Sequence, residues 1–188
     1  MSGTATIHEA QLTPSKLELL AQWLPSQPWF TGDAGDLERV ASFRFVDPDG
    51  EVGIETMIVR SGGVVYQVPL TYRDEALDGE DAYLVGTTDH SVLGKRWVYD
   101  ATGDPVYVAE LIRVIHEADN EADLSRGEKS MTVVGSGITL VSNASMEAAR
   151  LVRVLDGEHI HTAVPLGTLT GTWTEDGAER TEVLATIR

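Results

Sequence analysis

Val64-Val65-Tyr66-Gln67-Val68-Pro69-Leu70-Thr71-Tyr72-Arg73 is the stretch that decides the fold of this chain. Apolar and aromatic side chains occupy every second position from Val64 to Tyr72. This alternation predicts a β-strand with one face buried. Pro69 has no backbone N–H to donate to a neighbouring strand, so we expect this strand to lie at a sheet edge or to contain a bulge.

Two further strands are predicted immediately before this one, over residues 37–46 and 51–60. Turn-forming residues separate the three strands, first at 47–50 and then at 61–63. Short connections of this kind indicate three consecutive antiparallel strands. The acid-rich segment 74–81 should be a solvated loop, followed by strand-like residues at 82–86 and 96–99.

Two helices are predicted. The first starts at Thr13-Pro14-Ser15, with a capping hydroxyl followed by proline, and ends at Pro25. The second starts at Asp104-Pro105, where apolar residues recur at i, i+3, i+4 and i+7 up to Ile115. Both helices should pack on the sheet.

The second half of the chain is predicted to be nearly all β. Strand-like segments occupy 131–142, 150–155, 160–165, 167–174 and 181–187, with Asp-Gly turns at 156–157 and 176–177. We therefore expect an α+β protein with a largely antiparallel curved β-sheet or partial barrel and two or three packed helices. The expected organisation is an α+β region at 1–118, a polar linker or loop at 119–129, and a β-rich extension at 130–188 packed with the first part as one domain.

The composition restricts the classes of partner. Thirty acidic residues against fourteen Lys and Arg give a formal net charge of −16, which disfavours nucleic-acid and membrane-surface binding. The chain has no cysteine, and its N-terminus does not read as a signal peptide. We expect a cytoplasmic protein whose protein partner presents basic residues. The sequence leaves the oligomeric state open.

The motifs Trp29-Phe30-Thr31-Gly32 and Tyr66-Gln67-Val68-Pro69-Leu70 resemble the N-terminal cap domain of bacterial maltokinases. The resemblance runs from about residue 17 to about residue 118 and departs from the family at Asp33, where a lysine is usual. The catalytic Asp and Asn residues that phosphoryl transfer by a kinase needs are not recognised in this chain. The resemblance therefore implies a stand-alone, non-catalytic cap-like domain with a binding or regulatory role in maltose, trehalose or α-glucan metabolism.

Three groups of residues are candidates for a site. Asp89, His90 and Arg96 form a candidate polar site in a strand-like hairpin. His159 and His161 face the same side if extended, which is a weak metal-ligand pattern without a third ligand. The third group is a candidate aromatic groove for sugar rings, made of Trp29, Tyr66, Tyr72 and Trp97.

Two other functions stay open. One is a small sugar-acting enzyme built around the candidate polar site, and the other is a small-molecule carrier with a β-barrel cavity. No catalytic residue is assigned, and no cofactor is predicted.

Overall fold

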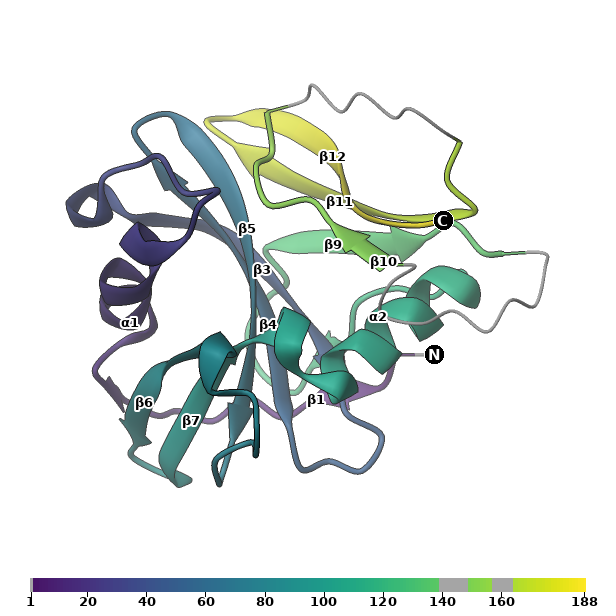
Figure 1. Cartoon of the computed structure of the whole chain (residues 1–188). Coiled ribbons are helices and arrows are strands. Elements are labelled where there is room, and N and C mark those ends of the chain that lie inside the picture. Colours follow the sequence, from purple (N-terminus) through teal and green to yellow (C-terminus); the bar gives the residue numbers. More distant parts are fainter. Residues whose placement is uncertain (1, 139–148, 157–163) are drawn as a thin grey trace.

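The computed structural model describes residues 2–138, 149–156 and 164–188, and it contains three β-sheets and two α-helices (Figure 1). The α-helices are α1 (Lys16–Trp23) and α2 (Pro105–His116). The strands are β1 (Thr4–Ala5), β2 (Leu12–Thr13), β3 (Glu38–Val46), β4 (Gly53–Ser61), β5 (Val64–Arg73), β6 (Leu84–His90), β7 (Gly94–Asp100), β8 (Asp123–Leu124), β9 (Met131–Gly135), β10 (Ala149–Leu151), β11 (Gly167–Glu175) and β12 (Ala178–Ile187).

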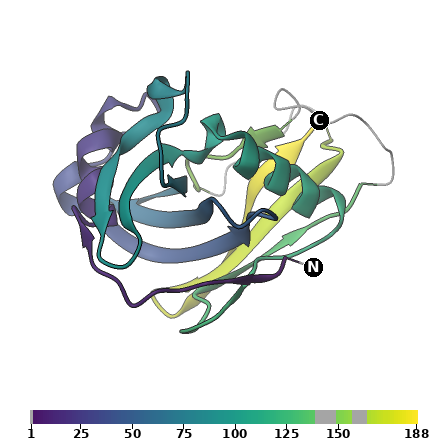
Figure 2. The ribbon, with the colours of Figure 1, turned by 90° about the horizontal axis from the view of Figure 1, so that it is seen from below.

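The largest sheet has six strands in the order β2-β6-β7-β5-β4-β3, and all of its pairings are antiparallel. It curls into a half-barrel around α1 (Figures 1 and 2). The predicted α+β class with a curved antiparallel sheet or partial barrel is confirmed.

The half-barrel is buried on both faces. Successive side chains of a strand point to opposite sides, so each strand contributes residues to both faces. On β4, Met57 and Val59 face α1 and join a core that includes Leu20 of that helix. Ile54 and Ile58 face the other way, into a second core. Both faces of the central strands are therefore apolar, which explains the nearly continuous apolar run in this part of the sequence.

The second core joins the half-barrel to the rest of the chain. It contains Phe43 and Phe45 from β3, residues of α2, and side chains of the C-terminal sheet such as Leu169 and Trp173. That sheet has the order β10-β12-β11-β9 and lies beside the half-barrel, with α2 in contact with β3, β9 and β11 (Figure 1). The C-terminal sheet is thus packed on the half-barrel through shared apolar residues.

Pro69 lies in an interior strand and not at an edge, because β5 pairs with both β4 and β7. Only residues 70–73 of β5 pair with β7. Earlier in β5, on the same side of the strand, the N–H of Gln67 donates to the carbonyl of Arg153 at 2.8 Å. Alternate residues of a strand direct their N–H to the same side, so the missing donor of Pro69 falls between these two pairings. The edge prediction was wrong, and the gap in the pairing explains why proline is tolerated here.

The start of α1 also differs from the prediction. Thr13 lies in β2, and Ser15 is the N-cap, whose Oγ accepts the N–H of Glu18 at 3.3 Å. The carboxylate of Glu18 in turn accepts the N–H of Ser15 at 2.7 Å, which completes a capping box. The helix ends before a 3₁₀ turn at Leu24–Ser26 that contains Pro25.

The start of α2 is as predicted. Asp104 is the N-cap and accepts the N–H of Val106 at 3.0 Å, with Pro105 at the first helical position. Arg73 at the end of β5 donates to both carboxylate oxygens of Asp104, each at 2.8 Å. This bidentate ion pair fixes the helix start to the half-barrel.

The predicted C-terminal strands are partly confirmed. β11 and β12 form the predicted hairpin, and Asp176 and Gly177 at its turn have φ of 50° and 80°, as a type I′ turn requires. β9 ends at Gly135 and β10 at Leu151, both earlier than predicted. Residues 139–142, the turn residue Gly157 and the predicted strand at 160–163 lie outside the described residues.

Candidate functional site: a cationic groove around Glu55

Glu55 is a carboxylate at an interior position of β4 with 2% of its surface exposed. Strand alternation directs it to the same side as Met57, toward α1. In the sheet register Arg44 of β3 lies directly opposite Glu55. A carboxylate in such a position must be paired, because burying an isolated charge is strongly unfavourable.

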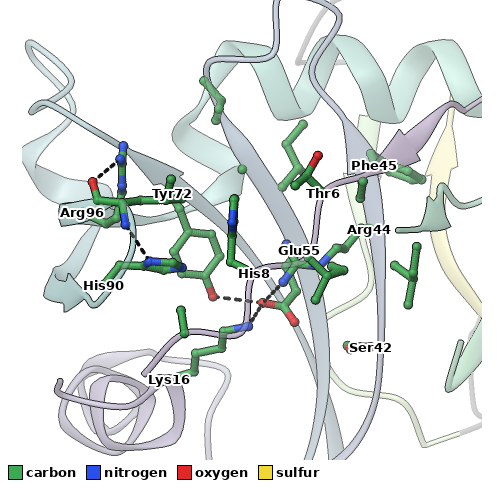
Figure 3. Close-up of a pocket in the computed structure, with 18 of the residues that line it drawn as sticks. Thr6, His8, Lys16, Ser42, Arg44, Phe45, Glu55, Tyr72, His90 and Arg96 are labelled. Carbon is green, nitrogen blue, oxygen red and sulfur yellow. Dashed lines mark hydrogen bonds and ion pairs between the residues drawn. The ribbon is translucent and has the colours of Figure 1, made fainter. Parts of the chain in front are cut away.

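Three side chains from different elements contact Oε2 of Glu55. Lys16, at the start of α1, forms an ion pair with it. Arg44 places Nη2 at 3.2 Å, and the Tyr72 hydroxyl donates at 3.2 Å. Figure 3 shows these groups converging from α1, β3 and β5. We call Lys16, Arg44, Glu55 and Tyr72 the Glu55 cluster.

The protonation states follow from burial and charge. Burial alone raises the pKa of Glu55, but Lys16 and Arg44 outweigh it, so the pKa of Glu55 lies below its ordinary value. Burial lowers the pKa of Lys16, although Glu55 opposes this. Burial, followed by the charge of Glu55, raises the pKa of the Tyr72 hydroxyl well above its usual range. At neutral pH, Glu55 is therefore ionised and Tyr72 is a neutral hydrogen-bond donor.

Arg39 adds a further positive charge because of a bulge in β3. The register of β3 on β4 shifts between Arg39 and Ala41, so that Arg39 lies opposite Val59 and Ala41 opposite Ile58. The extra residue breaks the strict alternation that would place Arg39 on the same face as Ala41. Arg39 is exposed, lines the same groove as the Glu55 cluster, and acts electrostatically on Glu55.

The groove has a volume of about 1350 Å³ and extends from the Glu55 cluster to the β6–β7 hairpin. His8 lies on the segment between β1 and β2, and its ring meets that of His90 edge to face, with centroids 5.8 Å apart. Arg96 of β7 lines the groove beside His90 (Figure 3). We call this space, lined by the Glu55 cluster with His8, Arg39, His90 and Arg96, the cationic groove.

The candidate polar site is only partly assembled. His90 and Arg96 line the cationic groove, whereas Asp89 is exposed and is not among the residues that line it. Nδ1 of His90 accepts the N–H of Leu93 at 3.0 Å, which fixes the hairpin turn. Burial is the main cause that lowers the pKa of His90, helped by His8, Arg96 and Lys16. The neutral imidazole is therefore the favoured form.

The candidate aromatic residues do not share one surface. Tyr66 is fully buried and packs with Trp29 in the core against α1, with ring centroids 6.1 Å apart. Tyr72 belongs to the Glu55 cluster. Trp97 lies on the β6–β7 hairpin, where Lys95 places Nζ 4.5 Å from its ring centroid. Tyr66 is part of this core, and Trp29 is half-buried and packs against it.

The histidine pair His159 and His161 lies outside the described residues. Within residues 2–138, 149–156 and 164–188, no group of three or more His, Asp or Glu side chains could hold a metal ion. Among the helices of this described part, none has both the length and the apolar character needed to cross a membrane.

Sequence reasoning missed the Glu55 cluster, although one signal pointed to it. Glu55 lies between Ile54 and the apolar run from Met57 to Val59, and a carboxylate in such a run is rarely buried unless it has a partner. The identity of that partner could not be read from the sequence. Lys16 is 39 residues away and comes from a different element.

Comparison with known proteins bears on the same part of the fold. No curated protein matches this chain significantly. Residues 23–104 match the family model described as the maltokinase N-terminal cap domain. The matched range contains the half-barrel strands β3 to β7 and ends at the N-cap of α2. The resemblance to the maltokinase N-terminal cap domain is therefore confirmed for residues 23–104, which contain five of the six strands of the half-barrel.

Proposed function

We propose that this protein is a non-catalytic cap-like domain that binds a protein partner and regulates it. The observation that carries the proposal is the family match over the half-barrel. The family is named for a cap that precedes a kinase and not for the catalytic part. We therefore infer that residues 23–104 have a binding role in this chain.

The packing of the half-barrel supports a binding role. The apolar part of its inner face is packed against α1, with Leu20 and Leu24 completely buried, and the open cationic groove lies beside this core. The core against α1 is therefore filled by side chains and is not a closed apolar cavity such as a carrier would use. The outer face of the half-barrel is covered by α2 and the C-terminal sheet. The surfaces that remain for a protein partner are the loops, the tips of the hairpins, and the solvent-exposed faces of α2 and the C-terminal sheet.

The net charge indicates the chemistry of the partner. A formal charge of −16 gives a negative potential over much of the surface. A partner with a basic face would be steered toward this protein, and its association would slow as salt screens the field. The family name points to maltose metabolism, and we place the partner among enzymes of maltose, trehalose or α-glucan metabolism. We place the protein in the cytoplasm with it.

The test is capture of the partner from a native extract on the immobilised full chain. An unrelated acidic protein of similar size and charge, immobilised at the same density, is the matched control for nonspecific ion exchange. We expect an enzyme of these pathways to be held at low salt on this protein alone and to be released at high salt. Recovery of the same proteins on both columns, or of none, would contradict the proposal.

A further inference from the structure

We propose that the cationic groove binds a small organic oxyanion of the phosphate monoester class, with Arg39, Arg44 and Lys16 around the phosphate. This site is separate from the proposed protein partner, and neither proposal depends on the other. The inference starts from the charges that the fold brings together around Glu55.

The centre of the groove holds more positive charge than Glu55 can neutralise. Lys16 and Arg44 both pair with this one carboxylate, and Arg39 acts on it from the bulge. Three cations against one carboxylate leave a net charge of +2. In a chain with more than twice as many acidic as basic residues, such an excess is opposite to the character of the surface.

These cations are also available to a ligand. The side chains of Lys16 and Arg44 are 23% and 22% exposed, and Arg39 is exposed without an ion pair in the described part of the chain. A guanidinium offers several N–H donors in a fixed plane and suits a phosphate better than a point charge does. Two arginines and a lysine match a dianion in both charge and number of donors.

The acidic residues of the groove determine the size of the ligand. Glu51, Asp74, Glu75 and Glu128 line it and are exposed, whereas Asp47 and Glu55 are buried. Asp47 accepts backbone N–H groups of its own turn. The positive charge is therefore confined to the centre of the groove, around Glu55. Exposed carboxylates around a cationic centre repel a long polyanion such as an acidic peptide but leave room for a single charged group. The groove volume of about 1350 Å³ also exceeds what a lone phosphate ion needs. We therefore favour a small hydroxylated molecule that carries one phosphate.

The polar side chains near the centre suit the uncharged part of such a ligand. Tyr72 is a neutral hydroxyl already held by Glu55, and Ser42 and Thr6 line the same groove (Figure 3). Arg96 lies on the β6–β7 hairpin beside the neutral imidazole of His90 and extends the positive field of the groove. Hydroxyl groups of a ligand would find donors and acceptors here without another charge.

The experiment is isothermal titration calorimetry of the full chain at pH 7 and low salt, with inorganic phosphate, glucose 6-phosphate and glucose as probes. We expect saturable binding of the two phosphates and no binding of glucose. Tighter binding of glucose 6-phosphate than of inorganic phosphate would support the small organic ligand. Absence of saturable binding by both phosphates would overturn the proposal.

Variants locate the site. Arg39→Gln removes an exposed charge that makes no ion pair in the described structure, so it should fold normally and weaken phosphate binding about tenfold. Arg188→Gln makes the same charge change at an exposed position that does not line the groove, and it should leave the affinity unchanged. Glu55→Gln should act in the opposite direction and tighten binding about tenfold. Equal losses in Arg39→Gln and Arg188→Gln would show general charge attraction and refute the groove as the site.

Discussion

Replacement of Gln67 by leucine tests how the C-terminal sheet is held to the half-barrel. Gln67 is completely buried in β5, and its Nε2 donates to the carbonyl of Val152 at 2.7 Å and to that of Leu184 at 2.8 Å. One amide thus joins β5 to two segments that are more than 80 residues away in sequence. Leucine keeps a similar volume and removes both donors.

The cost can be worked from these contacts. A buried carbonyl that loses its donor costs about 1–3 kcal/mol, and the loss is smaller where another donor remains. The carbonyl of Leu184 keeps the N–H of Val152 at 2.9 Å. Gln67 Oε1 is buried and has no hydrogen-bond partner among the described residues. Its removal is therefore favourable and offsets part of the lost free energy of unfolding. We expect Gln67→Leu to lower the free energy of unfolding by about 2–3 kcal/mol.

The assay is urea unfolding followed by tryptophan fluorescence and by far-UV circular dichroism. Gln11→Leu, at an exposed position, is the matched control and should change the free energy of unfolding by less than about 0.5 kcal/mol. We propose that the two parts of the chain form one domain, so both probes should report a single transition. A change below about 0.5 kcal/mol for Gln67→Leu would refute this account of the amide.

Other predictions concern Asp104 and His90. Asp104→Ala removes the N-cap of α2 and the bidentate partner of Arg73. It should lower the free energy of unfolding, measured in urea, by about 3–5 kcal/mol. A loss below about 1 kcal/mol would contradict the role of this pair. Burial raises the pKa of Asp104, but bonds from Arg73 and the helix start outweigh it and lower the pKa. Its contribution is therefore complete above the ordinary pKa near 4 and is lost as pH falls through the lower folded pKa, so Asp104→Asn should flatten the stability profile below about pH 4. Burial and nearby cations lower the pKa of His90. As the pH falls, the imidazole is therefore protonated in the unfolded chain before it is protonated in the folded one. The free energy of unfolding should fall as the pH is lowered from about 7 to about 5. His90→Gln should reduce that fall, and an unchanged profile would contradict the assignment.

Much of the half-barrel could be predicted because its signals are local. Alternation within 37–46 and 64–72, and an apolar-rich segment between turns at 51–60, predict strands that the structure confirms as β3, β5 and β4. The capping pair Asp104-Pro105 predicts the start of α2 in the same way. Each signal depends on residues within a few positions of one another, which is the range over which sequence patterns carry information.

The cationic groove could not be predicted because its parts meet only through tertiary structure. Lys16, Arg44 and Tyr72 come from three elements, and their convergence on Glu55 depends on the register of β3 and β5 and on the position of α1. The bulge that directs Arg39 into the groove adds one residue to β3 and leaves no distinctive pattern in sequence. The pairing of β5 with the segment around Arg153 is equally long-range.

The proposed regulation of an enzyme is the central claim, and one measurement tests it most directly. The rate of the captured enzyme on its own substrate is followed while the full chain is added at low salt and then at high salt. We predict a saturable change in rate at low salt that disappears at high salt. A rate that does not change at any concentration of this protein would contradict a regulatory role.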